Sequence, residues 1–112
     1  MSTYNTNVVV VSGRLTHDPK LSEPSRGEAQ GEKVYSVLRL AINTPNGRGG
    51  TKPIYEEVKC WNGLARACVE HKRKGDLVTV TGRLDQYNKP GDGGRWKYIT
   101  AESVEFAGRR DR

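Results

Sequence analysis

The sequence has few of the features that mark secreted, membrane-inserted or disulfide-stabilised proteins. Only two cysteines, Cys60 and Cys68, occur in 112 residues. They do not form a disulfide framework, and we expect a reducing, cytoplasmic setting. The apolar run near the N-terminus, residues 8–11, is four residues long and follows no basic segment, which argues against a signal peptide. No stretch approaches the roughly 20 apolar residues of a transmembrane helix, so we expect no contact with a membrane.

Motifs of catalysis and cofactor binding are also missing. The sequence contains neither a Walker-type phosphate loop nor a G-x-S-x-G nucleophile elbow. The glycine-rich stretches at 46–50 and 89–94 do not lead from a strand straight into a helix, so we interpret them as turns. His17 stands beside Asp18 but has no nucleophile next to it. We expect no enzymatic activity and no cofactor.

The spacing of Cys60, Cys68 and His71 offers three potential metal ligands. A structural zinc site requires four ligands in a tetrahedral arrangement. We therefore predict no metal site and place the two cysteines in the core.

Positive charge predominates in what the sequence does contain. Nineteen Lys and Arg stand against thirteen Asp and Glu, which gives a net charge of +6. An anionic polymer or an anionic surface suits such a balance as a partner. The length indicates one domain, whose core needs no disulfide or metal to fold.

Five segments have the composition and alternation of β-strands, and one has a helical pattern. The strands are predicted at 7–15, 33–42, 54–63, 76–87 and 95–106, and the helix at 63–74. The helix is predicted to start at an Asn62 N-cap and to bury Leu64, Ala67, Cys68 and His71. A loop is predicted at 43–53, and Leu84 is predicted to point inward with its alternating neighbours.

Gly13 and Gly82 stand where a tightly curved sheet has to bend. The order of elements is three strands, a helix and two strands. This order predicts an all-β protein, a five-stranded Greek-key OB-fold barrel with one α-helix between strands 3 and 4.

The third predicted strand has two different faces, because successive side chains point to opposite sides. One face carries two aromatic rings with a charge of each sign between them: Tyr55, Glu57, Lys59 and Trp61. The other face can bury Ile54, Val58 and Cys60. The first face carries charged side chains and is therefore poorly suited to packing in the core. We interpret it as a surface that offers flat rings and a cation to an external ligand.

Several motifs, in order, resemble those of the bacterial single-stranded DNA-binding proteins. They are NVVVVSGRLTHDP, LRLAIN, VKCWNGLARACVEHKRKGDLVTVTGRL and AESVEF, which lie within roughly residues 5–107. The resemblance implies an OB-fold homotetramer that wraps single-stranded DNA without sequence preference. It also implies a role in DNA replication, recombination and repair, in the cytoplasm and on the nucleoid, without a cofactor.

The resemblance also implies which residues bind DNA. Tyr55 and Trp61 match two base-stacking positions of the family, and Lys89 lies where some members have a stacking Trp, for which Tyr87 can substitute. Tyr35 and Trp96 are further candidates on strands. The cations expected to contact phosphate are Arg14, Arg39, Lys59, Arg83 and Lys89.

The C-terminal end departs from the family pattern. We expect the OB-fold domain at 1–107 and, at 108–112, a short basic end without the acidic tail through which members bind replication and repair proteins. Partners of that kind are therefore uncertain. A truncated chain, a tailless paralogue and a plasmid- or phage-encoded member all fit this end.

Three other functions stay open at this point. A primosome-type OB protein binds single strands while it recruits helicase-loading factors, and an RNA-binding OB domain uses the same stacking and phosphate contacts. A protein-interaction OB module would use its aromatic face to bind a peptide. The interleaved cations favour nucleic acid over peptide, whereas nothing in the residues separates DNA from RNA.

Overall fold

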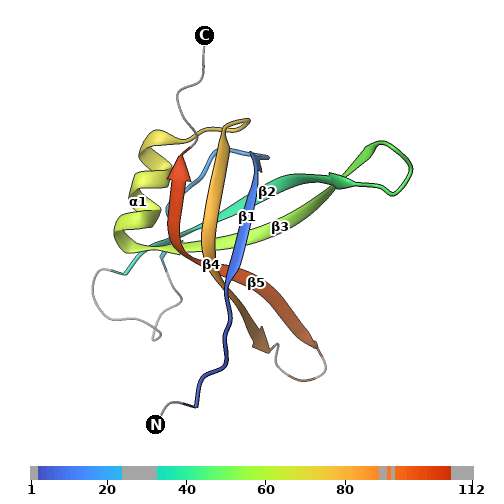
Figure 1. The fold of residues 1–112 in the computed structure, drawn as a ribbon. Helices are drawn as coiled ribbons and strands as arrows, with labels where there is room; N and C mark the ends of the chain where they lie inside the picture. The colour runs from blue at the N-terminus through green and yellow to red at the C-terminus, as the bar shows by residue number, and fades with distance from the viewer. Residues whose placement is uncertain (1–2, 24–32, 89–90, 92, 107–112) are drawn as a thin grey trace.

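The computed structural model describes residues 3–23, 33–88, 91 and 93–106 (Figure 1). Its elements are β1 (Val9–Leu15), β2 (Tyr35–Pro45), β3 (Thr51–Trp61), α1 (Asn62–His71), β4 (Leu77–Asn88) and β5 (Arg95–Phe106). The strands close into a barrel in the order β1-β2-β3-β5-β4, in which the β3–β5 pair is parallel and the others are antiparallel. The predicted five-stranded OB-fold, with its helix between the third and fourth strands, is confirmed. Lys89 and residues 107–112 lie outside the described residues.

The core is the inside of the barrel, which every strand helps to fill. Alternate side chains point inward, and the most deeply buried are Leu38, Leu40, Val58, Val78, Val80 and Ile99. Helix α1 packs against β2 and β3 and adds Ala65 and Cys68 to the same cluster. Cys60 and Cys68 are free thiols inside this core, as predicted.

Two glycines allow the strands of the barrel to approach each other closely. A Cβ atom at Gly13 would lie 2.6 Å from the Ala41 carbonyl oxygen on β2. A Cβ atom at Gly82 would overlap the Thr100 carbonyl oxygen on β5, where the β4–β5 register shifts between Thr81 and Gly82. Glycine is therefore required at these bends for a steric reason.

The β2 and β3 strands extend further than the sequence indicates. They pair from Tyr35 opposite Trp61 to Pro45 opposite Thr51, so most of the predicted 43–53 loop is strand. The outer part of this hairpin, residues 43–54, projects from the barrel and is called the β2–β3 arm below (Figure 1). Because the arm leaves the core, Ile54 is 44% exposed instead of buried.

The outer half of the hairpin formed by β4 and β5 also extends beyond the barrel. It consists of residues 84–88 and 95–98, called the β4–β5 hairpin below, and lies beyond the register shift at Gly82. Leu84, predicted to point inward, is 51% exposed there. The alternation of β4 therefore predicts burial correctly only for the half of the strand that lines the barrel.

Helix α1 begins and ends earlier than predicted. Its N-cap residue is Trp61, which makes no side-chain capping bond, and Asn62 is the first helical residue at a φ of 52°. The Asn62 Oδ1 accepts a hydrogen bond from the Val34 N–H, which fixes the chain before β2. His71 is the last helical residue and is exposed. With 10 residues, α1 is too short to cross a bilayer, and the described part of the chain has no helix that is long and apolar enough to do so.

Candidate nucleic-acid interface

A groove runs between β2–β3 and the β4–β5 hairpin. Its inner hollow has a volume of about 180 Å³ and its outer hollow about 210 Å³. The rings of the inner hollow are Tyr35, Tyr87, Trp96 and Tyr98, and its other lining residues are Val37, Glu57, Lys59 and Lys97. The outer hollow is lined by Arg39, Tyr55, Glu56, Glu57, Trp96 and Lys97. Because Glu57, Trp96 and Lys97 line both hollows, the two form one continuous groove.

The β-sheet geometry explains why these side chains meet. Tyr55, Glu57 and Lys59 share one face of β3, as the alternation predicts, and all three line the groove. Tyr87 and Trp96 are direct partners in the β4–β5 ladder, and both line the opposite wall. Half or more of Tyr55, Tyr87 and Trp96 is exposed, at 60%, 53% and 50%. Each offers a ring face to an incoming planar group.

Lys59 holds its ammonium group among three aromatic rings. The Nζ atom lies 4.6 Å from the ring centroid of Tyr35, 5.2 Å from that of Trp61 and 5.5 Å from that of Tyr98. The Tyr35 and Trp61 rings pack against each other with centroids 5.3 Å apart, at 45°. Cation–π attraction of this kind keeps a cation and flat rings in place before any ligand arrives. Trp61 supports this cluster from beside the inner hollow and does not line it.

The arginines predicted to contact phosphate are all engaged within the protein. The Arg39 Nη2 lies 2.7 Å from the Glu57 Oε2 in the groove. The Arg83 guanidinium lies 2.9 Å from the Glu102 carboxylate and 3.9 Å from the Asp85 carboxylate. Arg83 does not line either hollow, and its charge is largely balanced by these neighbours.

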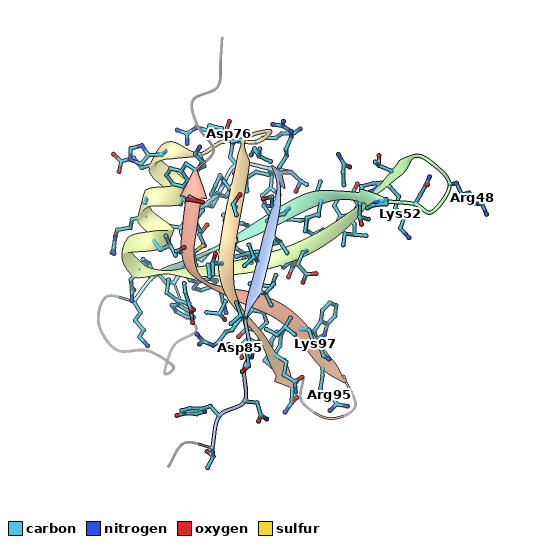
Figure 2. The ribbon with its side chains drawn as sticks, viewed as in Figure 1. Arg48, Lys52, Asp76, Asp85, Arg95 and Lys97 are labelled. Atoms are coloured by element: carbon cyan, nitrogen blue, oxygen red, sulfur yellow. The ribbon has the colours of Figure 1, made fainter. Side chains whose placement is uncertain are left out.

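Arg14 lies away from the groove. Its Nη1 donates to the Gly75 carbonyl oxygen, in the turn that precedes β4. This turn includes Asp76, at the end of the barrel opposite to Lys97 (Figure 2). Of the cations predicted to contact phosphate, the structure therefore brings Lys59 and Arg39 to the groove, while Arg14 and Arg83 lie outside it.

Five residues that line the groove were not predicted as binding residues from the sequence: Val37, Glu56, Glu57, Lys97 and Tyr98. Of these, Lys97 and Tyr98 extend the set of cations and rings. Trp96, Lys97 and Tyr98 place a cation between two rings at consecutive positions, and this signal could have identified Lys97 and Tyr98. Burial, followed by the nearby Asp85 carboxylate, raises the pKa of Tyr98 above its ordinary value. The phenol is therefore neutral at pH 7 and can donate a hydrogen bond.

The two cysteines lie apart from this site. A hydrogen bond with Cys68 and burial raise the pKa of the Cys60 thiol far above its ordinary value, so it is neutral. His71, the third residue of the spacing noted in the sequence, lies on the surface of α1 with its ring centroid 6.4 Å from that of Phe106. Within the described residues, no cluster of His, Cys, Asp and Glu has the arrangement of a metal site.

Comparison with known proteins identifies relatives of the chain. The model of the single-strand binding protein family matches residues 6–107. "Single-stranded DNA-binding protein 3" of Listeria innocua is 35% identical over 105 residues, which are 89% of this chain and 62% of that protein. "Single-stranded DNA-binding protein" of Oceanobacillus iheyensis is 32% identical over the same shares. That of Fusobacterium nucleatum is 32% identical over 106 residues, 89% of this chain and 66% of that protein. The chain thus spans about 62% of the length of the first two relatives.

Proposed function

The chain belongs to the single-strand binding protein family, and we propose that it binds single-stranded DNA along the groove between β2–β3 and the β4–β5 hairpin. One observation carries this proposal: Tyr55, Tyr87 and Trp96 present exposed ring faces around a groove that also holds Lys59 and Lys97. Every base has a π-face, so stacking on such rings tolerates any sequence and requires unpaired bases. The lysines lie where they can neutralise the phosphates between the stacked bases.

We propose coating of exposed strands as the biological role. Binding of the unpaired form shifts the duplex–single-strand equilibrium by mass action and requires neither catalysis nor a cofactor. Such coating serves replication, recombination and repair in the bacterial cytoplasm. The names of the relatives support this role over that of a primosome-type or peptide-binding OB module.

We further propose that the chain self-associates, as the homotetramer of the family implies. The outer face of β1 and the residue before it expose Val10 (62%) and Val8 (67%). Among the described residues, β1 pairs with β2 at Arg14 and Leu15, whereas it pairs with β4 along most of its length. A partly unpaired edge with apolar side chains is a surface on which a second chain can add a strand.

A tryptophan-fluorescence titration tests the DNA-binding proposal. Oligo-dT should bind more tightly than duplex DNA of equal length, since only unpaired bases can stack. The logarithm of the affinity should fall with the logarithm of salt concentration, with a slope of about −0.7 per phosphate neutralised. Equal affinity for duplex and single strands would contradict the proposal, and tighter binding of oligo-rU would assign the groove to RNA.

A further inference from the structure

Asn7 forms two hydrogen bonds with the backbone of a single residue of β4. Its Nδ2 donates to the Leu84 carbonyl oxygen at 3.0 Å, and its Oδ1 accepts from the Leu84 N–H at 2.9 Å. A side-chain amide carries both an acceptor oxygen and a donor NH₂ group, so it can take the place of a peptide group in such a pair. Asn7 therefore binds Leu84 in the way that a residue of a neighbouring strand would.

These two bonds continue the pairing of β1 with β4 past the end of β1. The backbone ladder of the two strands ends at Val9 opposite Gly82. The same antiparallel register, extended by two residues on each strand, places Asn7 opposite Leu84. Because Leu84 directs both its N–H and its C=O to Asn7, a side chain satisfies this edge of β4 where the backbone ladder has stopped.

Leu84 is the first residue of the β4–β5 hairpin, which forms one wall of the proposed binding groove. The rings of Tyr87 and Trp96 lie on this hairpin and line the groove. A two-stranded hairpin is at best marginally stable in water by itself. The position of this wall therefore depends on the contacts that join the hairpin to the rest of the barrel.

Two such contacts lie on different sides of the hairpin. On the groove side, the Lys59 Nζ on β3 lies 5.5 Å from the ring centroid of Tyr98. On the other side, Asn7 holds the edge of β4 that faces away from β5. Asn7 is itself exposed and lines neither hollow. It can thus influence the groove through the hairpin without contacting a ligand inside it.

Resting on the proposed function, we propose that Asn7 is a positioning residue for the binding of single-stranded DNA. Its two bonds fix the β4–β5 hairpin at the separation from β2–β3 that admits stacked bases. A wall that is already in place loses less conformational freedom when a strand enters, and this preorganisation increases affinity.

Asn7→Ala removes both bonds and tests this role. We expect the amides of 85–88 and 95–98 to exchange faster with solvent, measured by NMR, because the hairpin opens more often. The amides of 78–80, inside the barrel, should keep their wild-type rates. The affinity of the folded protein for oligo-dT, measured by fluorescence anisotropy, should fall by about two- to tenfold, the effect of a hydrogen bond of ordinary net strength.

Asn5→Ala is the matched control. Asn5 is exposed in the same N-terminal segment, and its side chain makes no hydrogen bond within the described residues. Its substitution removes the same amide group and should change neither the exchange of the hairpin nor the affinity. If Asn7→Ala did not fold, Asn7→Gln would serve in its place, because glutamine keeps both polar groups but moves them one methylene further from the backbone.

A double-mutant cycle separates positioning from a general structural defect. In a Tyr87→Ala/Trp96→Ala background the hairpin has two fewer rings to hold over the DNA, so Asn7→Ala should weaken binding by about twofold or less. A defect elsewhere would give the same fold-change in both backgrounds. That result, or wild-type exchange or affinity in Asn7→Ala, would overturn the positioning role. A wild type that does not bind oligo-dT would instead refute the proposed function.

Discussion

At the scale of single residues, the two tryptophans have different surroundings and therefore different expected roles. Trp96 is 50% exposed and lines both hollows, whereas Trp61 packs against Tyr35 under the Lys59 ammonium. We expect Trp96→Ala to weaken binding of oligo-dT by about 1–3 kcal/mol, because one stacking face is lost. Its melting temperature should change little. Anisotropy titration gives the affinity, and Trp61, then the sole tryptophan, reports folding by its fluorescence.

Tyr4→Ala is the control for this experiment. Tyr4 is 90% exposed and lies outside both hollows, so its loss should leave the affinity unchanged. If Trp96→Ala melted far below the wild type but bound DNA normally when folded, Trp96 would be a packing residue. Base stacking would then have to be assigned to Tyr55 and Tyr87.

At the scale of elements, the curvature of β4 depends on Gly82. A methyl group there would overlap the Thr100 carbonyl oxygen, which is backbone and cannot rotate away. We expect Gly82→Ala to lower the free energy of unfolding by about 1–3 kcal/mol, as overpacking of a tight site generally does. Urea denaturation followed by circular dichroism measures this change.

Gly63→Ala in α1 is the comparison for Gly82→Ala, because Gly63 has space for a methyl group. A Cβ atom at Gly63 would have no neighbouring atom within 4 Å, and its φ is not positive. Alanine is a better helix former than glycine by up to about 1 kcal/mol, so we expect a small gain in stability. A Gly82→Ala protein as stable as the wild type would show that barrel closure does not need the close approach at Thr100.

At the scale of the whole molecule, self-association is expected to use the outer face of β1. Val10 is 62% exposed, so Val10→Lys should leave the barrel folded. A lysine at that position would bury a charge in the proposed interface, at a free-energy cost that favours dissociation. We expect sedimentation equilibrium to show an oligomer for the wild type and a smaller species for Val10→Lys.

Ile54→Lys on the β2–β3 arm is the comparison for Val10→Lys. Ile54 is 44% exposed and lies on β3, which β2 separates from β1 in the barrel, so the same added charge should leave the oligomer intact. A monomeric wild type would refute the self-association proposal, and an unchanged oligomer in Val10→Lys would move the interface to another face.

Much of the architecture follows from local patterns in the sequence. The β5 bounds, 95–106, agree with the prediction, and the β3 alternation assigned Tyr55, Glu57 and Lys59 to one face correctly. Alternation reports which side chains share a face, because the strand has a period of two residues. The order of the elements and the two bend glycines then restricted the fold to a small closed barrel.

The tertiary structure alone decided which charged and aromatic residues meet. Register brings Arg39 opposite Glu57, and the strand pairings place Arg83 opposite Thr100, close to Glu102 and Asp85. No local pattern contains these pairings, so the sequence could not show that both arginines are engaged.

The lengths of the two hairpins were also decided by the tertiary structure and not by local sequence patterns. Leu84 is apolar and alternates correctly, yet it is exposed because its part of β4 extends past the barrel. The groove itself exists because the β4–β5 hairpin places Trp96 and Lys97 across from Glu57, which lies some 40 residues earlier in the chain. Sequence by itself determined the strands, their faces and the barrel. Strand register and hairpin length, which depend on contacts between distant segments, decided where the proposed binding site lies and which charges remain available in it.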